Sequence, residues 1–380
     1  MPDFGKVALS QLSDVNNHMV YNTDLTLRKW KLALANLDRS KATAVVWGDS
    51  ISVGAFASDH RHNSWVGRLK KLIQDKYGDG GEGSYFLPKN SLDHKPWSSV
   101  FSYMDISDGW LFNTSSTSYS VTGIRLESTG AGKTITCTFI GDTIDIIYTK
   151  GPDAPVAGVS VAIDSIAKGT IDFNNTVITT NHKASYSGLG SGQHTLIVTS
   201  NAQFAWIDGF VAHTTQLTGS KGVEVVTLAT GGMSAHDYVS ICASSVALYP
   251  ANLYIIALGV NDTVQGLSTF QSDLQTLITT AKNSGGDVLL LAHAMNDVAY
   301  QTKMDSNRAI MQNLARLNNC GFIDMKNVFG GNRSNFVSDG IIGQTDDGII
   351  GWTGNEGSDG FHFSDRGHRM IGQSVFSVIG

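Results

Sequence analysis

Four short polar motifs along the chain hold residue types that acyl transfer requires. The sequence GDS ends at Ser50, and DGFH runs from Asp359 to His362. A serine hydroxyl is a poor nucleophile until a base removes its proton, and histidine titrates in the range that this role requires. A carboxylate three residues before the histidine, across a tight turn, could hold the imidazole ring in the required tautomer. The first and last motifs therefore offer a nucleophile, a base and an orienting carboxylate.

The two motifs between them could stabilise the negative charge that develops during such a reaction. GGMS covers residues 231–234, and GVND covers residues 259–262. Glycine lets a backbone N–H approach a ligand closely, and the side-chain amide of Asn261 can donate a hydrogen bond to an oxyanion. Each motif alone is equally typical of an ordinary turn, a helix cap or a surface loop. Their order in the chain and their positions decide between these interpretations.

Three of the four motifs directly follow short apolar runs that are typical of buried parallel strands. Alternating strands and helices predict a parallel sheet with helices on both faces. Because ligands bind at the carboxyl ends of the strands in such sheets, we expect the motifs to meet there. The apolar runs cover residues 43–47, 223–229, 253–258, 288–292 and 322–324, and helical patterns cover 65–77, 234–247, 268–283, 304–318 and 366–378.

The middle of the chain shows short strands with alternating apolar and polar side chains. Clusters of Gly, Asn, Ser and Asp separate these strands, and such spacing is typical of an antiparallel β-sandwich. Insertions in surface loops are tolerated because loop closure costs little more as the loop grows. We therefore expect an α/β domain from residues 41–97 and 216–380, an inserted sandwich at 98–215, and an N-terminal lead-in helix within 1–40.

The four motifs in this order resemble the four sequence blocks of the SGNH (GDSL-like) hydrolase superfamily, which are GDS, a loop glycine, GxND and DxxH. The resemblance covers residues 42–95 and 220–380. It implies a flavodoxin-like, three-layer α/β/α fold and an ester hydrolase activity. One departure is Phe363, because the family often has proline after the catalytic histidine.

The resemblance also assigns roles to residues. It implies that Ser50 is the nucleophile, that His362 is the general base, and that Asp359 completes the triad. It implies an oxyanion hole formed by the backbone N–H groups of Ser50 and Gly232 and by the side chain of Asn261. Gly231 is the alternative to Gly232 in this role.

A metal site is the competing interpretation of the last motif. Asp359, His362, Asp365 and His368 are evenly spaced by three residues. Phenylalanines interleave with them, and no cysteine or second cluster completes a ligand shell. We therefore predict that the site uses neither a metal nor a cofactor.

Other polar residues near the motifs are expected to have structural roles. We predict His236 on a helix surface and His368 on a helix surface or in a cap. His293 is expected either to face the cleft or to be a satisfied histidine of the core or rim. Asp49 and Asp262 are predicted to bond nearby backbone N–H groups that hold their loops.

Composition argues against several kinds of partner. The formal net charge is −6 and the Lys and Arg residues are scattered, so nucleic-acid binding is not expected. No apolar run approaches the ~20 residues of a membrane span, and the N-terminus lacks the pattern of a secretory signal. The sequence favours an extracellular or virion-associated protein and leaves open a homo-oligomer or assembly into a virus tail. We interpret Cys137, Cys242 and Cys320 as buried or incidental thiols.

The inserted segment favours a carbohydrate partner. Residues 192–199 look similar to pieces of carbohydrate-binding-module sandwiches, and exposed aromatic rings could stack on sugar faces. The resemblance then points to carbohydrate esterases that remove O-acetyl groups, and the layout resembles esterase domains of bacteriophage tails. Each of these rings could instead belong to the core of the sandwich. They are Trp97, Trp110, Tyr119, Tyr148, Tyr186 and Trp206.

Two alternative functions remain to be compared with an O-acetyl esterase that acts through an acyl-enzyme. A lipid esterase or thioesterase of the same superfamily would prefer long acyl chains and would need an apolar acyl pocket. A glycan-binding or virion structural module with a spent site would bind without hydrolysis. The complete set of four motifs argues against a spent site.

Overall fold

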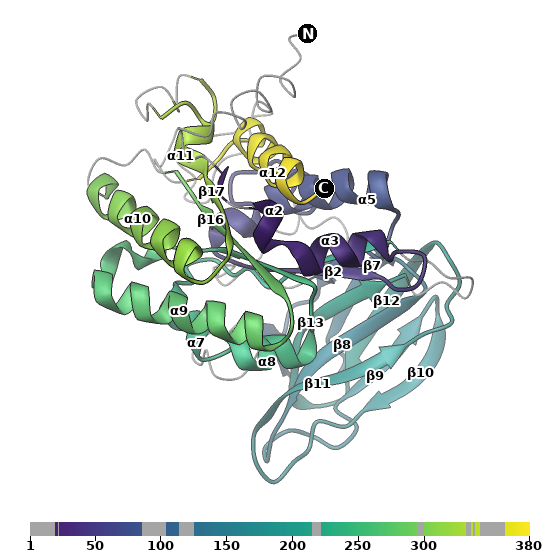
Figure 1. Cartoon of the computed structure of the whole chain (residues 1–380). Coiled ribbons are helices and arrows are strands. Elements are labelled where there is room, and N and C mark those ends of the chain that lie inside the picture. Colours follow the sequence, from purple (N-terminus) through teal and green to yellow (C-terminus); the bar gives the residue numbers. More distant parts are fainter. Residues whose placement is uncertain are drawn as a thin grey trace.

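The computed structural model describes residues 20–21, 23–85, 104–113, 125–214, 222–294, 300–331, 336, 339–342 and 362–380. Asp359, Trp97 and Tyr119 lie outside the described residues. An α/β part and an all-β part, the latter formed by the middle of the chain, lie side by side (Figure 1).

The α/β part is built around one six-stranded sheet. The strands lie in the order β1-β17-β16-β15-β2-β14, in which β1 runs antiparallel to β17 and the other neighbours are parallel. Without β1, the chain order across the sheet is 2-1-3-4-5, which is the flavodoxin-like order. The predicted α/β fold class is therefore confirmed. The strands are β1 (Val20–Tyr21), β2 (Ala42–Gly48), β14 (Val223–Thr227), β15 (Leu253–Ala257), β16 (Asp287–Ala292) and β17 (Gly321–Asp324).

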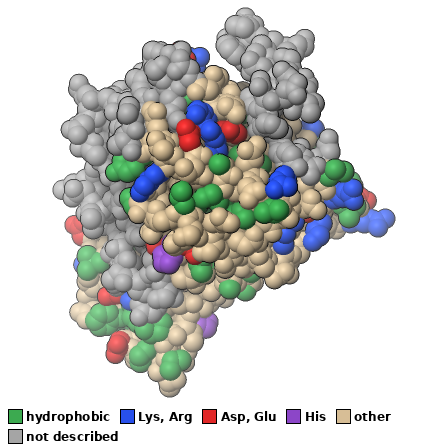
Figure 2. Space-filling view, turned by 60° about the vertical axis from the view of Figure 1, so that its left-hand side comes forward, with side chains coloured by type: hydrophobic (Ala, Val, Ile, Leu, Met, Phe, Trp, Pro, Cys, Tyr) green, Lys and Arg blue, Asp and Glu red, His purple; other side chains and the backbone are tan. Residues whose placement is uncertain are grey.

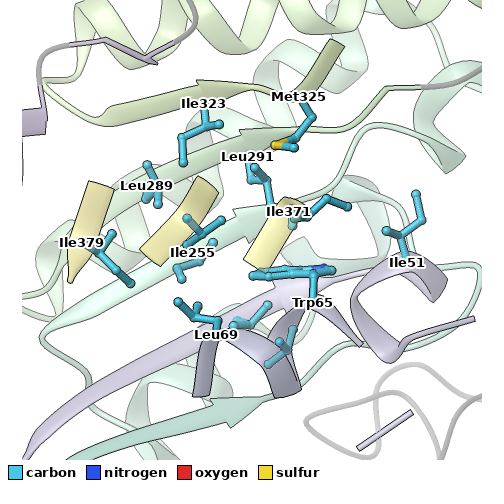
Figure 3. Packing of buried hydrophobic residues seen from close by; sticks show 14 of the residues in the cluster. Ile51, Trp65, Leu69, Ile255, Leu289, Leu291, Ile323, Met325, Ile371 and Ile379 are labelled. Carbon is cyan, nitrogen blue, oxygen red and sulfur yellow. The ribbon is translucent and has the colours of Figure 1, made fainter. Parts of the chain in front are cut away.

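Helices cover both faces of this sheet, which makes three layers (Figure 1). On one face, α3 (Arg28–Ala35), α5 (Trp65–Tyr77) and α12 (Asp365–Ile379) bury an apolar cluster. Figure 3 shows part of this cluster, with Trp65 beside Ile371. The other face is covered by α7 (Ala235–Val239), α8 (Cys242–Leu248), α9 (Leu267–Asn283) and α10 (Gln301–Leu317). Short helical turns are α2 (Thr23–Thr26), α4 (Ser50–Val53), η1 (Asn261–Val264) and α11 (Met325–Val328).

The single helix predicted over residues 234–247 is wrong, because the chain forms α7 and α8 instead. The hydroxyl of Ser240 donates to the carbonyl of Asp237 over 2.8 Å. A continuous helix would need that carbonyl for the N–H of Ile241, which instead donates to Tyr238 O. The serine therefore competes with the backbone at the point where the helix breaks.

The N-terminal helix packs into the α/β part. Trp30 of α3 is fully buried, and its indole N–H donates to the carbonyl of Ile379 over 2.7 Å. Its backbone N–H donates to Asp287 at the start of β16, 2.9 Å away. The segment predicted as a lead-in thus contributes to the same core as α12.

The all-β part consists of two antiparallel sheets that share one core, which we call the two-sheet domain. Leu196 and Cys137 face each other in one sheet and lie in the same buried cluster as Ile146 and Phe210 of the other. One sheet has the order β10-β9-β12-β7-β4 and the other β11-β8-β13-β6-β5, with β3 added beside β13. The bounds are β3 (Gly83–Tyr85), β4 (Met104–Ile106), β5 (Trp110–Asn113), β6 (Arg125–Thr129), β7 (Thr134–Ile140), β8 (Thr143–Lys150), β9 (Val159–Ile163), β10 (Ile166–Ile171), β11 (Thr179–Tyr186), β12 (Gln193–Ser200) and β13 (Gln203–His213).

Four of the aromatic rings that the sequence offers as sugar platforms belong to the core of the two-sheet domain. Trp110 and Trp206 are 2% and 5% exposed. Tyr148 and Tyr186 are partly buried and pack against the same cluster. For these four rings the core interpretation holds, and none is a freely exposed platform for a sugar.

A buried charged cluster joins the two parts of the molecule. The two ring nitrogens of His213 on β13 contact carboxylates from different parts, Glu224 of β14 and Asp145 of β8, the latter at 2.9 Å. Lys41 reaches Glu224 at 2.7 Å, and Lys183 reaches Asp145 at 3.4 Å. We call these five residues the junction cluster.

The three cysteines are buried free thiols, as predicted. Uncharged polar side chains and backbone predominate on the face drawn in Figure 2, in keeping with the charged fraction of 16%. Among the described helices, none combines the length and the apolar character that crossing a bilayer demands.

Candidate active site

Ser50 begins the short helix α4 at the carboxyl end of β2. Asp49 caps this helix, because its carboxylate accepts a hydrogen bond of 3.0 Å from the backbone N–H of Ile51. Gly48 is required here: a Cβ atom at this position would lie 2.2 Å from the hydroxyl oxygen of Ser52. The absence of that atom lets α4 fold back onto the end of the strand and turn Ser50 toward the edge of the sheet.

His362 meets Ser50 across 312 residues of sequence. Its Nε2 atom lies 2.8 Å from Oγ of Ser50, the distance at which a neutral imidazole can accept the hydroxyl proton. His362 is half-buried and lies two residues before the N-cap of α12, Ser364, whose hydroxyl accepts from Gly367 N. The structure thus brings together the residues predicted as nucleophile and base. Asp359, the predicted third member, falls outside the described residues.

Asp365 ties α12 to the segment that follows the nucleophile. Its carboxylate accepts hydrogen bonds from both the backbone N–H and the hydroxyl of Ser58, the former at 2.9 Å. The side-chain amide of Asn63 also approaches Asp365, at 3.4 Å. This residue, considered in the sequence as a metal ligand, is bonded to protein groups instead.

His368 is fully buried, so of its two predicted places the helix surface is wrong, whereas its ring does cap the first N–H group of α5. Its Nδ1 accepts a hydrogen bond from Trp65 N over 3.2 Å, and its Nε2 donates to Ala55 O over 3.1 Å. Only a neutral imidazole can accept at one nitrogen and donate at the other. His368 and Asp365 therefore join α12 to the segment that follows Ser50, a link that nothing in the local sequence indicates.

The predicted oxyanion residues lie after the two strands that flank β2. Gly232 follows β14 and Asn261 follows β15, and both strands are parallel neighbours of β2. Gly232 has a φ of +77°, which glycine adopts without strain. The side-chain amide of Asn261 donates to Met233 O over 2.9 Å, so it is fixed against the loop of Gly232. We call the carboxyl ends of these three strands, with their loops, the catalytic edge.

The aspartates of the motifs hold these loops, as predicted. Asp262 is buried, and both of its carboxyl oxygens accept from Ala235 N, at 2.9 and 3.1 Å. This contact joins the third motif to the helix that follows the second. Burial raises the pKa of Asp49 and that of Asp262 to about 7 each.

Several histidines behind the catalytic edge are held uncharged. Burial lowers the pKa of His60 and that of His293 to about 3, and that of His368 to about 4. His293 is 2% exposed, so it belongs to the core, and neither of its ring nitrogens has a hydrogen-bond partner among the described residues. His236 is exposed on α7 and contacts Asp273 at 3.0 Å, as predicted for a surface residue.

Part of the chain matches a known protein family, and its fold matches solved structures. The profile of the GDSL-like lipase/acylhydrolase family matches residues 188–370, a range that includes Gly232, Asn261 and His362 but not Ser50. No curated protein sequence matches the chain. A solved structure described as a peptidoglycan O-acetylesterase in action superposes with a TM-score of 0.67 at 15% identity, covering 94% of this chain and 97% of that one. This likeness extends over both parts of the molecule and concerns the fold.

Two further solved structures cover a smaller share of the chain. An acetyl xylan esterase from Geobacillus stearothermophilus is 17% identical, covers 42% of this chain and 74% of its own, and has a TM-score of 0.35. A lipase/acylhydrolase from Enterococcus faecalis is 19% identical, covers 41% and 75%, and has a TM-score of 0.34.

The three-layer fold, the edge of the sheet at which the motifs meet and the family match define the class of the protein. It is a carboxylic ester hydrolase. Residues 188–370, which hold three of the four motifs, match the GDSL-like lipase/acylhydrolase family, and the α/β part has the three-layer fold that the SGNH resemblance implies.

Proposed function

We propose that the protein is a serine esterase that removes acyl groups, above all O-acetyl groups, from a carbohydrate or polysaccharide. The observation that carries the proposal is the distance of 2.8 Å between Ser50 Oγ and His362 Nε2 at the carboxyl end of β2. A serine hydroxyl paired in this way with a neutral imidazole is an activated nucleophile.

In the first half of the proposed reaction, Ser50 Oγ attacks the ester carbonyl while His362 Nε2 takes the hydroxyl proton. The carbonyl oxygen becomes an oxyanion, stabilised by the backbone N–H groups of Ser50 and Gly232 and by the amide of Asn261. An amide has two N–H bonds. One of those on Asn261 fixes the side chain on Met233 O, and the other serves the oxyanion.

The tetrahedral intermediate then collapses. The bond between the carbonyl carbon and the sugar oxygen breaks, and His362 returns the proton to that oxygen, which leaves as an alcohol. Water attacks the acyl-enzyme, His362 takes a proton from the water, and Ser50 recovers its proton as the carboxylic acid leaves. Asp359 would accept a hydrogen bond from the imidazole and hold its tautomer, as the DxxH motif implies.

One comparison supports an acylated carbohydrate as the substrate. The solved structure that matches over nearly the whole chain is described as a peptidoglycan O-acetylesterase. The other matches include acetyl xylan esterases, whose limited superposition adds no weight. The match over the whole length includes the two-sheet domain, so the combination of both parts occurs in an enzyme that deacetylates a polymer.

The direct test is hydrolysis of p-nitrophenyl esters from acetyl to dodecanoyl by the wild type and by Ser50→Ala. Fastest cleavage of the acetate by the wild type, with an inactive variant, would support the proposal, and acetylated polysaccharides would be screened next. Preference for long chains would favour a lipid esterase or thioesterase. Equal rates for the two proteins would refute the assignment of Ser50.

A further inference from the structure

The turn that follows the nucleophile carries an aromatic ring on an unfavourable backbone. Phe56 has a φ of +70°, in the left-handed region that bulky residues rarely adopt. A conformation of this kind persists only where the surrounding contacts impose it, and such residues cluster at functional sites. The contacts of the Phe56 ring are therefore informative.

The ring of Phe56 stacks on the ring of His362. Their centroids are 5.3 Å apart and their planes differ by 12°. The hydrogen bond to Ser50 leaves the edge of the imidazole, at Nε2, whereas the phenyl ring covers its face. The two contacts restrain different motions: the hydrogen bond acts within the plane of the imidazole, and the stack opposes tilting out of that plane.

The turn that bears Phe56 is fixed from both catalytic segments. The backbone N–H of Ala55 donates to the carbonyl of Ser50 over 2.9 Å, and the carbonyl of Ala55 accepts from His368 of α12 over 3.1 Å. Gly54 has a φ of +103°, and a Cβ there would lie 2.6 Å from the Cβ of Ser64. The left-handed backbone at Phe56 is thus held between the nucleophile and the helix that follows His362.

We propose that Phe56 is a positioning residue for the catalytic histidine: its ring, held by the turn after Ser50, fixes the plane in which His362 meets the serine hydroxyl. This inference rests on the proposed function of Ser50 and His362. His362 must carry a proton from Ser50 to the leaving oxygen without changing its orientation. A flat surface on one face of the ring meets this need without occupying either nitrogen.

The test compares three variants that keep an apolar or aromatic side chain. Phe56→Leu removes the flat face, and Phe56→Tyr keeps it. Phe204→Leu is the matched control, because Phe204 also has a left-handed backbone, with a φ of +62°, and lies partly exposed on the two-sheet domain. For p-nitrophenyl acetate we expect kcat to fall about 10-fold in Phe56→Leu, with KM little changed. Phe56→Tyr should recover most of the activity, and Phe204→Leu should match the wild type.

Three kinetic results would overturn the inference. Equal kcat in Phe56→Leu and Phe204→Leu would show that the stack has no catalytic consequence. Equal losses in the Leu and Tyr variants would assign the effect to size rather than to a flat ring. A rise in KM at constant kcat would make Phe56 part of the substrate site instead.

Nuclear magnetic resonance on the wild type tests the stack even if the Phe56 variants fail to fold. The ring current of Phe56 should shift the His362 ring protons upfield, with assignment by their loss in His362→Gln. Absence of that shift would contradict the stack. If the wild type hydrolyses no ester, the proposed function fails, whereas an active wild type with unaffected Phe56→Leu refutes only the positioning role.

Discussion

The catalytic edge and the junction cluster each place a histidine among polar partners, and the partners give the two histidines different tasks. At the junction, burial disfavours the charged form of His213, but hydrogen bonds to Asp145 and Glu224 outweigh it and raise the pKa of His213 to about 9. At the catalytic edge, His362 faces a neutral hydroxyl, and the neighbouring His368 is kept uncharged. Carboxylates on both ring nitrogens make His213 a structural cation, whereas Nε2 of His362 meets a serine hydroxyl.

The greatest loss of activity is expected when His362 is removed. His362→Ala should lower kcat by about 10⁴-fold, because Ser50 then has no base. Asp359→Ala should lower it less, since orientation is only part of what the base contributes. The measurement is steady-state hydrolysis of p-nitrophenyl acetate, with His236→Ala as the surface control. An active His362→Ala enzyme would show that His362 is not the base.

Removal of the junction histidine should affect stability rather than chemistry. His213→Phe leaves two buried carboxylates without their shared cation, which we expect to cost about 3 kcal/mol of unfolding free energy at pH 7. The pKa of His213 is raised, so its stabilising contribution is full below about pH 6.5 and is lost as pH rises through about 9.

The alkaline decline in unfolding free energy should therefore be flatter in His213→Phe than in the wild type. Denaturant unfolding at several pH values measures both quantities. His236→Phe is the control, because it removes only an exposed pair. A variant as stable as the wild type, with an unchanged alkaline slope, would contradict the structural role of His213.

The contact between Asp365 and Ser58 should affect both stability and catalysis. Asp365→Ala leaves the backbone N–H of Ser58 without its acceptor, which we expect to cost about 2 kcal/mol and to lower kcat about 10-fold through displacement of His362. The exposed Asp75, paired with Lys71 on α5, is the control, and Asp75→Ala should change stability by less than about 0.5 kcal/mol. Identical behaviour of the two variants would remove the link between α12 and the catalytic edge.

The contribution of His368 to stability should depend on pH in the opposite sense from that of His213. The pKa of His368 is lowered to about 4, so its contribution to stability is present above pH 6.5 and is lost as pH falls through about 4. In His368→Phe the acid slope of the unfolding free energy should be smaller by up to about 1.4 kcal/mol per pH unit.

The measurement in the acid range is the difference in unfolding free energy between His368→Phe and the wild type at each pH. His60 and His293 contribute with the same sign, and Asp49 and Asp262 with the opposite sign. These groups remain in both proteins, and the contributions of Asp49 and Asp262 cancel in the comparison. The charge of His368 helps to lower the pKa of His60 and that of His293, so its removal should flatten the acid slope further in the same direction. If the unfolding free energies of the two proteins fall in parallel as the pH is lowered, the pKa of His368 is not lowered.

Much of the fold could be predicted because its signals are local. Continuous apolar runs marked the parallel strands, and the motifs followed the strands that the flavodoxin-like order places side by side. The pairing of Ser50 with His362 was implied by the family resemblance instead, because the last motif precedes a helix and follows no predicted strand. β1 was not, because two residues carry no periodicity.

The contacts that hold the site together could not be predicted in this way. His368 lies between Arg366 and Arg369 in sequence, which is typical of a helix surface, yet contacts with Trp65 and Ala55 some 300 residues away bury it. The left-handed backbone of Phe56 has no local signal either, since glycine would be expected there. Both features arise only when α12 packs on the loop after β2.

Covalent trapping shows whether Ser50 is the nucleophile. The wild type would be treated with a fluorophosphonate, digested, and analysed by mass spectrometry. We predict one label, on the peptide that contains Ser50, with hydrolytic activity lost in proportion to labelling and no label in Ser50→Ala. Full loss of activity with the label on a different residue, or continued hydrolysis by a protein fully labelled at Ser50, would contradict the account.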